Sequence, residues 1–147
     1  EKAYLPSDVI TAYNGKTIEV LDTDAEGRMT LADGLSYLSK NFETDVLIDL
    51  ATLTGSSVRM FGYTCGAYFS NNDDLKKALE KSADKTNQHT ADCGLDGTFL
   101  EQFIEGHQNW AHLDIAGVAF GNVGYAKDKA ATGYGVQLLL DFIENYN

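Results

Sequence analysis

The residues best placed to do chemistry are four charged side chains at alternate positions of one short stretch. Asp22, Asp24, Glu26 and Arg28 follow directly after an apolar run, and all four belong to residues 22–28. If the chain stays extended there, alternate side chains point the same way and the four share one face. Carboxylates crowded in this way repel one another unless a cation lies among them, and hard divalent ions accept carboxylate oxygens readily. The spacing is compatible with a metal site, although a solvated acidic turn is the commoner outcome of such a pattern.

Two predicted elements must position these side chains. Residues 8–13 and 17–21 have the pattern of strands and are joined by Asn14 and Gly15, a strong signal for a β-hairpin. Beyond the acidic stretch, leucines recur at helical spacing and predict a helix from about Met29 to Lys40. The acidic stretch is therefore expected between the end of a strand and the start of a helix, where active sites of open α/β sheets lie.

The rest of the chain alternates predicted strands with predicted helices. Strands are expected at residues 45–50, 64–70 and 110–116. Helices are expected from 73, capped by Asn72, to about 85, from 98 to 105, and from 132 or 133 onward. Residues 87–97 and 117–135 are predicted loops. This order predicts the α/β class, with a largely parallel sheet, helices on both faces and an N-terminal β-hairpin that enters it.

Composition limits the class of protein. The 147 residues suffice for one domain with a packed core, and 44% of them are hydrophobic. A net charge of −11 disfavours binding to nucleic acid or to an anionic membrane. No apolar run has transmembrane length, and no signal peptide is visible. Cys65 and Cys93 lie far apart without a spacing motif, so reduced thiols and a cytoplasmic location are expected.

Three sequence blocks resemble the leucyl aminopeptidase (cytosol aminopeptidase) family. They are Thr23–Arg28 (TDAEGR), Ala51–Gly55 (ATLTG) and Trp110–Gly117 (WAHLDIAG), in the order in which the family has them. The resemblance is strong from about residue 4 to 85 and from 109 to the end, and it is poor around 86–98. It implies an enzyme that hydrolyses N-terminal amino acids, leucine-type, from peptides with a free N-terminus.

The first block implies a two-metal site. In the family, the aspartate at Asp24 binds one divalent ion, zinc or manganese, and the glutamate at Glu26 bridges two such ions. Together the ions activate a water that attacks the scissile carbonyl. The resemblance gives Arg28 a catalytic role, holding a bicarbonate that serves as general base; a planar guanidinium fork suits a planar oxyanion. Where the family has asparagine this chain has Asp22, which adds a negative charge beside the site.

The second block implies a substrate-binding loop. Thr52, Leu53 and Gly55 match the family loop whose backbone groups bind the peptide and whose small side chains leave room for the first residue. From the residues alone the same segment is a turn between a strand and a helix. In the third block, His112 and Asp114 are expected to be hydrogen-bonded within the fold, because the family places no catalytic residue there.

The resemblance also implies that part of the site lies outside this sequence. The family's remaining metal ligands, a lysine and two aspartates, and its catalytic lysine come from upstream of the portion matched here. Residues 1–147 are therefore expected to be the C-terminal part of a catalytic domain, nearly inactive alone. Since the family forms hexamers, a homo-oligomer is expected.

Two alternatives stay open. The first is a non-catalytic, truncated scaffold with the same fold. The second is a haloacid-dehalogenase-like phosphatase, in which Asp22 and Asp24 end an apolar strand, Thr52 is the second motif's threonine, and residues 73–74 are the acidic pair. Against the phosphatase, the Asp-x-Asp pattern is followed by Ala-Glu, and no lysine stands between Thr52 and the acidic pair.

Overall fold

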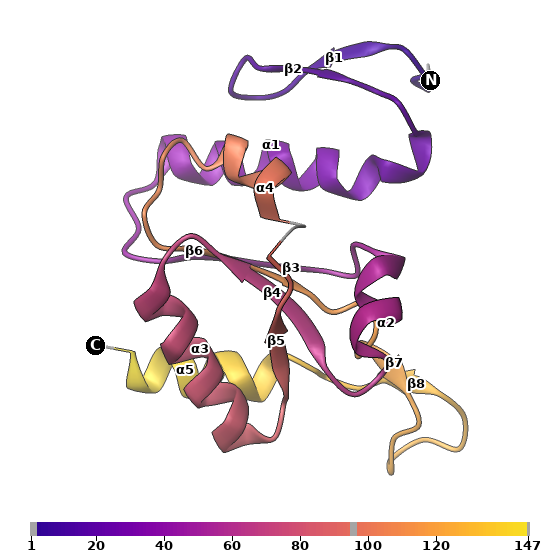
Figure 1. Ribbon diagram of the computed structural model, residues 1–147, viewed down its shortest axis with the longest axis vertical. Coiled ribbons are helices and arrows are strands. Elements are labelled where there is room, and N and C mark those ends of the chain that lie inside the picture. Colours follow the sequence, from indigo (N-terminus) through magenta and orange to yellow (C-terminus); the bar gives the residue numbers. More distant parts are fainter. Residues whose placement is uncertain (1–2, 95–96, 147) are drawn as a thin grey trace. The chain divides into compact units, whose positions relative to one another are not determined.

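The computed structural model describes residues 3–94 and 97–146, and the chain divides into two compact units (Figure 1). Unit 1 comprises Glu1–Asp45 and Thr98–His107, and unit 2 comprises Val46–Gly97 and Gln108–Asn147. Each unit has its own hydrophobic cluster, so each is described by itself.

Unit 1 is a β-hairpin followed by helices. Its elements are β1 (Val9–Thr11), β2 (Thr17–Glu19), the 3-10 helix η1 (Thr23–Ala25), α1 (Glu26–Asn41), α4 (Gly97–Leu100, at the unit boundary) and the 3-10 helix η2 (Glu101–Phe103). The predicted hairpin is confirmed: β1 and β2 pair antiparallel, and Gly15 takes a positive φ of 89° that side chains disfavour. Ala12, Ala32 and Phe103 are buried together, which packs the hairpin and η2 on α1.

The acidic stretch does not continue the strand, and the predicted extended geometry is wrong. The Asp22 carboxylate accepts a hydrogen bond from the Asp24 N–H at 3.0 Å, which caps the 3-10 helix η1. A side chain that satisfies one of the first helical N–H groups favours helix entry over a further strand residue. Helix α1 then begins at Glu26, three residues before the predicted start. The backbone turns by about 100–120° per residue here, so alternate side chains do not share one face.

Unit 2 contains a four-stranded sheet with three helices. Its main strands are β3 (Leu47–Ala51), β4 (Gly66–Ser70), β5 (Thr90–Asp92) and β6 (Trp110–Asp114), in the order β3-β6-β4-β5. The pairs β3–β6 and β4–β5 are parallel, whereas β4–β6 is antiparallel. The α/β class is therefore confirmed, with a sheet that is parallel in two of its three pairings.

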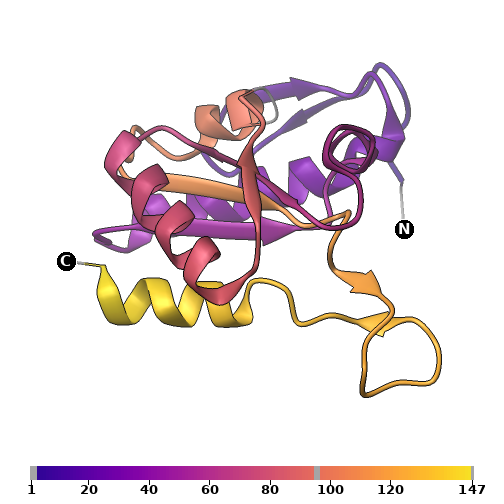
Figure 2. The ribbon, with the colours of Figure 1, turned by 60° about the horizontal axis from the view of Figure 1, so that its bottom comes forward.

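Two helices cover one face of this sheet. Helix α3 (Asp73–Thr86) and helix α5 (Val136–Asn145) lie side by side against it (Figure 2). The buried cluster that joins them to the strands comprises Tyr68, Leu75, Leu79, Ala83, Ala111, Leu113, Leu138 and Phe142. Asn72 caps α3 as predicted, because its side-chain oxygen accepts from the N–H groups of Asp74 and Leu75 at 2.9 Å. Gln88 does the same for α5, accepting from Gly135 N–H at 3.2 Å and Leu138 N–H at 2.9 Å.

Two segments predicted as loops contain strands. Residues 87–97 include β5, which pairs with β4, and residues 117–135 include the short antiparallel pair β7 (Phe120–Gly121) and β8 (Ala130–Ala131). Both predictions missed these strands because the pairing partner, not a local alternation of apolar residues, specifies them. The link between β7 and β8 projects from unit 2 (Figure 2). Within the described residues, no helix is long and apolar enough to cross a membrane.

Candidate functional site

The predicted metal and catalytic residues lie close in sequence in η1 and the first turn of α1. The Asp24 and Glu26 side chains are exposed, and Arg28 is half-buried. Neither carboxylate accepts a hydrogen bond from the described part of the chain, and no ion pair there joins either of them to Arg28. The Arg28 Nε atom is buried and lacks a partner among the described residues. Arg28 is therefore not held as a counter-ion by the neighbouring carboxylates of the described chain.

The two carboxylates offer oxygen ligands of the kind that hard divalent ions accept. Such an ion takes about six ligands. Within residues 3–94 and 97–146, no three His, Cys, Asp or Glu side chains are grouped to hold a metal. Asp24 and Glu26 therefore fit a divalent ion as two members of a larger ligand set.

Glu26 also borders a hollow between the hairpin and α1. The hollow has a volume of about 240 Å³ and is lined by Tyr4, Ile10, Thr11, Ala12, Ile18, Glu26, Met29, Thr30 and Asp33. The Asp33 carboxylate is already engaged, because it accepts a hydrogen bond from the Tyr13 N–H at 2.8 Å. Glu26 is thus the predicted ligand that combines exposure with a neighbouring cavity.

The predicted substrate-binding residues lie in unit 2, in the link from β3 to α2 (Gly55–Phe61). Thr52 and Gly55 are exposed, and Leu53 is half-buried. Thr54 fixes the end of this loop: its hydroxyl oxygen accepts from the Ser57 N–H at 3.2 Å and caps α2. The structure therefore groups the six predicted site residues into two sets, one at the start of α1 in unit 1 and one in this loop of unit 2.

In the third block, His112 and Asp114 are hydrogen-bonded within the fold, as predicted. His112 is fully buried on β6, and its Nδ1 lies 2.6 Å from Oδ1 of Asp49 on β3. The other Asp49 oxygen accepts from the Trp110 indole N–H at 2.8 Å. Asp114 is fully buried as well, and its carboxylate accepts hydrogen bonds from Leu53 and Thr54 in the predicted substrate loop. Sequence reasoning missed this link, for which the signal was a carboxylate at the end of an apolar strand.

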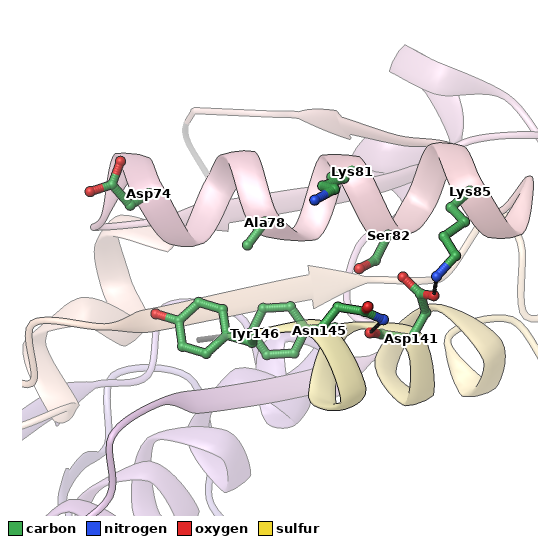
Figure 3. A pocket seen from close by; sticks show the side chains of 9 residues that line it. Asp74, Ala78, Lys81, Ser82, Lys85, Asp141, Asn145 and Tyr146 are labelled. Carbon is green, nitrogen blue, oxygen red and sulfur yellow. Dashed lines mark hydrogen bonds and ion pairs between the residues drawn. The ribbon is translucent and has the colours of Figure 1, made fainter.

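A groove between α3 and α5 holds no predicted site residue (Figure 3). Its volume is about 220 Å³, and Lys85 forms an ion pair with Asp141 across it. A hydrogen bond from Lys85 holds the pKa of the Asp141 carboxyl below its ordinary value, with further contributions from Ser82 and Lys81. Because these charges satisfy one another, we assign the groove to helix packing. The Cys93 thiol donates to the Tyr68 carbonyl at 3.2 Å, and burial raises the pKa of the Cys65 thiol.

Comparisons with known proteins identify the family. The model of the cytosol aminopeptidase family, catalytic domain, matches residues 1–97 and 87–140. The probable cytosol aminopeptidase of Chlorobaculum parvum is 41% identical over 172 residues, which is 99% of this chain and 34% of that protein. That of Rickettsia canadensis is 40% identical, over 99% of this chain and 35% of that protein. A mutant of tomato leucine aminopeptidase superposes with a TM-score of 0.84 at 35% identity, over 95% of this chain and 32% of the tomato chain.

These matches also show where the chain departs from its relatives. The chain spans about a third of the length of the curated relatives it matches. The two segments matched by the family model overlap at residues 87–97, within the part of the chain where the sequence resemblance is poor. The alignment to the Chlorobaculum parvum protein runs over 172 positions, more than the 147 residues of this chain, so the relative has additional residues. These matches are to aminopeptidases and give no support to the phosphatase alternative. The chain belongs to the cytosol aminopeptidase family, whose catalytic-domain model it matches along nearly its whole length.

Proposed function

We propose that this chain forms part of a metal-dependent aminopeptidase that removes leucine-type residues from peptides with a free N-terminus. One observation carries the proposal: three charged side chains, of Asp24 in η1 and of Glu26 and Arg28 in the first turn of α1, have no partner among the described residues. Solvent can satisfy the exposed carboxylates of Asp24 and Glu26. It does not reach the buried Nε of Arg28, and leaving a buried donor unsatisfied costs about 1–3 kcal/mol. Such a donor is expected where a ligand completes the hydrogen bonding.

Asp24 and Glu26 are proposed to hold two divalent ions, zinc or manganese, together with ligands outside this chain. When bound, such a pair of ions supplies a water molecule that is acidic enough to act as a nucleophile near neutral pH. The exposure of both carboxylates, and the hollow beside Glu26, are consistent with access for an ion. Asp22 is engaged in capping η1 and is not proposed as a ligand.

Arg28 is proposed to bind a bicarbonate that serves as general base. A guanidinium presents parallel N–H groups that match two oxygens of a planar anion, an arrangement that lysine does not reproduce. The unpartnered Nε of Arg28 is one such donor. A bicarbonate held there accepts a proton from the attacking water, so the residue acts by fixing the base rather than by titrating itself.

The loop Thr52–Gly55 is proposed to bind the peptide through Thr52, Leu53 and Gly55. Its backbone supplies hydrogen bonds to the substrate backbone, and the absence of a side chain at Gly55 leaves room for the first residue. Peptide substrates are compatible with the net charge of −11, because binding depends on the metal and on backbone groups. A cytoplasmic location, a homo-oligomer such as a hexamer, and a position in the C-terminal part of a catalytic domain complete the proposal.

The test is to supply the ligands that are proposed to lie outside these 147 residues. The chain is fused to the portion of the Chlorobaculum parvum relative that it does not cover, giving a complemented protein. This protein should hydrolyse leucine amide with Mn²⁺ or Zn²⁺, whereas the chain alone should be nearly inactive. Asp24→Asn and Glu26→Gln should each weaken Mn²⁺ binding measured by calorimetry and abolish turnover. Asp22→Asn, which restores the asparagine usual in the family, is the matched control and should keep both.

Three outcomes would count against the proposal. Turnover by the chain alone would contradict the shared ligand set. Mn²⁺ binding that is unchanged by both Asp24→Asn and Glu26→Gln would remove these residues from the site. A folded complemented protein that binds Mn²⁺ but never hydrolyses leucine amide would favour the non-catalytic scaffold.

A further inference from the structure

The Asp114 carboxylate accepts four hydrogen bonds, three of them from the predicted substrate loop. It is fully buried at the end of β6. Its Oδ1 accepts from the Leu53 N–H at 3.0 Å and from the Ala116 N–H at 3.1 Å. Its Oδ2 accepts from the Thr54 N–H at 3.0 Å and from the Thr54 hydroxyl at 2.7 Å. A buried carboxylate is costly unless it is hydrogen-bonded, and these four donors compensate for its burial.

Sheet register explains how one side chain reaches this loop. Strands β3 and β6 run parallel, and Asp114 is the partner of Ala51, the last residue of β3. The chain leaves β3 directly into the loop, so the first loop N–H groups lie beside the Asp114 carboxylate. Loop and carboxylate are therefore neighbours in space although about 60 residues separate them in sequence.

These hydrogen bonds set the direction of two backbone carbonyls. In a trans peptide unit, the C=O and the following N–H point in opposite directions, and no described peptide bond is cis. Because the N–H groups of Leu53 and Thr54 point at Asp114, the C=O groups of Thr52 and Leu53 point away from it. The loop thus presents two consecutive acceptors on the side opposite the carboxylate.

We propose that Asp114 is a positioning residue for substrate: by holding Leu53 and Thr54, it aims the carbonyls of Thr52 and Leu53 at N–H groups of the bound peptide. This inference rests on the proposed function. Asp114 does not touch the substrate in this scheme. An asparagine cannot replace it, because an amide has only one acceptor oxygen and turns an NH₂ group toward one of the loop donors.

The chain offers a matched control on the neighbouring strand. Asp49 is a second carboxylate with little exposure, and both of its oxygens are engaged, by the side chains of Trp110 and His112. No hydrogen bond links Asp49 to residues 52–55 within the described chain. Asp49→Asn and Asp114→Asn therefore disturb the same sheet, but only the second removes acceptors from the loop.

The experiment compares these variants in the complemented protein, at a temperature where each is folded by circular dichroism. For hydrolysis of leucine amide, Asp114→Asn should lower kcat/KM about 100-fold, the scale expected when a binding group is misplaced by about 1 Å. Thr54→Val leaves the carboxylate in place but removes both the hydroxyl donor to Asp114 and the cap of α2, and it should lower kcat/KM about 10-fold, between the two carboxylate variants. Asp49→Asn should stay within about threefold of the wild type, because it removes no hydrogen-bond acceptor from the loop. Mn²⁺ affinity should be unchanged in all three.

The outcomes separate the two hypotheses. If the wild-type complemented protein is inactive, the proposed function fails and this inference fails with it. If the wild type is active and Asp114→Asn matches it, the positioning role is wrong. The role is also wrong if Asp49→Asn and Asp114→Asn lose activity equally, because general damage to the sheet then explains both. Should Asp114→Asn not fold, Thr54→Val decides in its place, by its loss of kcat/KM relative to Asp49→Asn.

Discussion

Gly117→Ala is expected to destabilise unit 2 through a single added methyl group. Gly117 is buried just after β6, against the backbone of Gly62 at the end of α2. A Cβ built on Gly117 falls well inside 3.0 Å of the Gly62 carbonyl oxygen, closer than real Cβ atoms approach. Because the obstacle is backbone and not a flexible side chain, one of two chain segments must move.

The size of the effect follows from two opposing terms. Overpacking a close contact costs about 1–3 kcal/mol. Replacing glycine by alanine also restricts the unfolded chain, which stabilises the fold by about 0.4–1 kcal/mol. The expected net loss is about 1–2 kcal/mol, or a Tm about 2–8 °C lower for a chain of this size. Gly124→Ala is the matched control in the same unit, since a Cβ there meets nothing within 4 Å and the φ angle is not positive.

Fluorescence of Trp110 is a suitable assay because it is the only tryptophan, lies in unit 2 and is fully buried. Urea unfolding followed at this residue should place Gly117→Ala below the wild type and Gly124→Ala at or above it. Equal midpoints for the two variants would refute the argument, because the chemical change is the same and only the surroundings differ.

Two further predictions concern helix α5. Gln88→Ala should lower the stability of unit 2 by about 1 kcal/mol and speed amide hydrogen exchange at Gly135 and Leu138, because both N–H groups lose their side-chain acceptor. Gln88→Glu keeps the acceptor and should change neither the stability nor the exchange rates. Equal exchange rates in the two variants would contradict the capping role. The pKa of the Asp141 carboxyl is lowered from its ordinary value of 3.8, mainly by the hydrogen bond from Lys85. The ionised carboxylate therefore stabilises the fold fully above about pH 3.8, and this stabilisation is lost as the pH falls through the lowered pKa. Asp141→Asn should therefore flatten the acid side of the stability profile, measured as urea midpoints from about pH 5 to about pH 2, and an unchanged slope would show that the ion pair does not contribute.

Local signals in the sequence were sufficient for much of the fold. The turn at Asn14 and Gly15, the apolar run of β3 and the cap at Asn72 each act within a few residues, and each predicted element is present. Strand β5 and the pair β7–β8 were not predictable in this way. Their short segments are strands only because a partner elsewhere supplies the hydrogen bonds.

The candidate site shows the same division. The identities of Asp24, Glu26 and Arg28 come from a recognisable motif, but the geometry expected from strand alternation was wrong because Asp22 starts a helix. The role of Asp114 was out of reach of sequence reasoning for a different reason. Its partners in the loop are separated from it by about 60 residues, and only the register of two parallel strands brings them together.

The order of strands in unit 2 has a practical consequence for handling this protein. Strand β3 pairs with β6 on one side, and no strand of the described chain pairs with its other side. Edge strands of natural proteins are often protected from pairing by a proline, a lysine or another charged side chain. Strand β3 has the sequence Leu-Ile-Asp-Leu-Ala, and its single charged residue, Asp49, is hydrogen-bonded to Trp110 and His112. Extended segments of other molecules can add to such an edge, so concentrated solutions of the purified chain are expected to aggregate by intermolecular sheet formation.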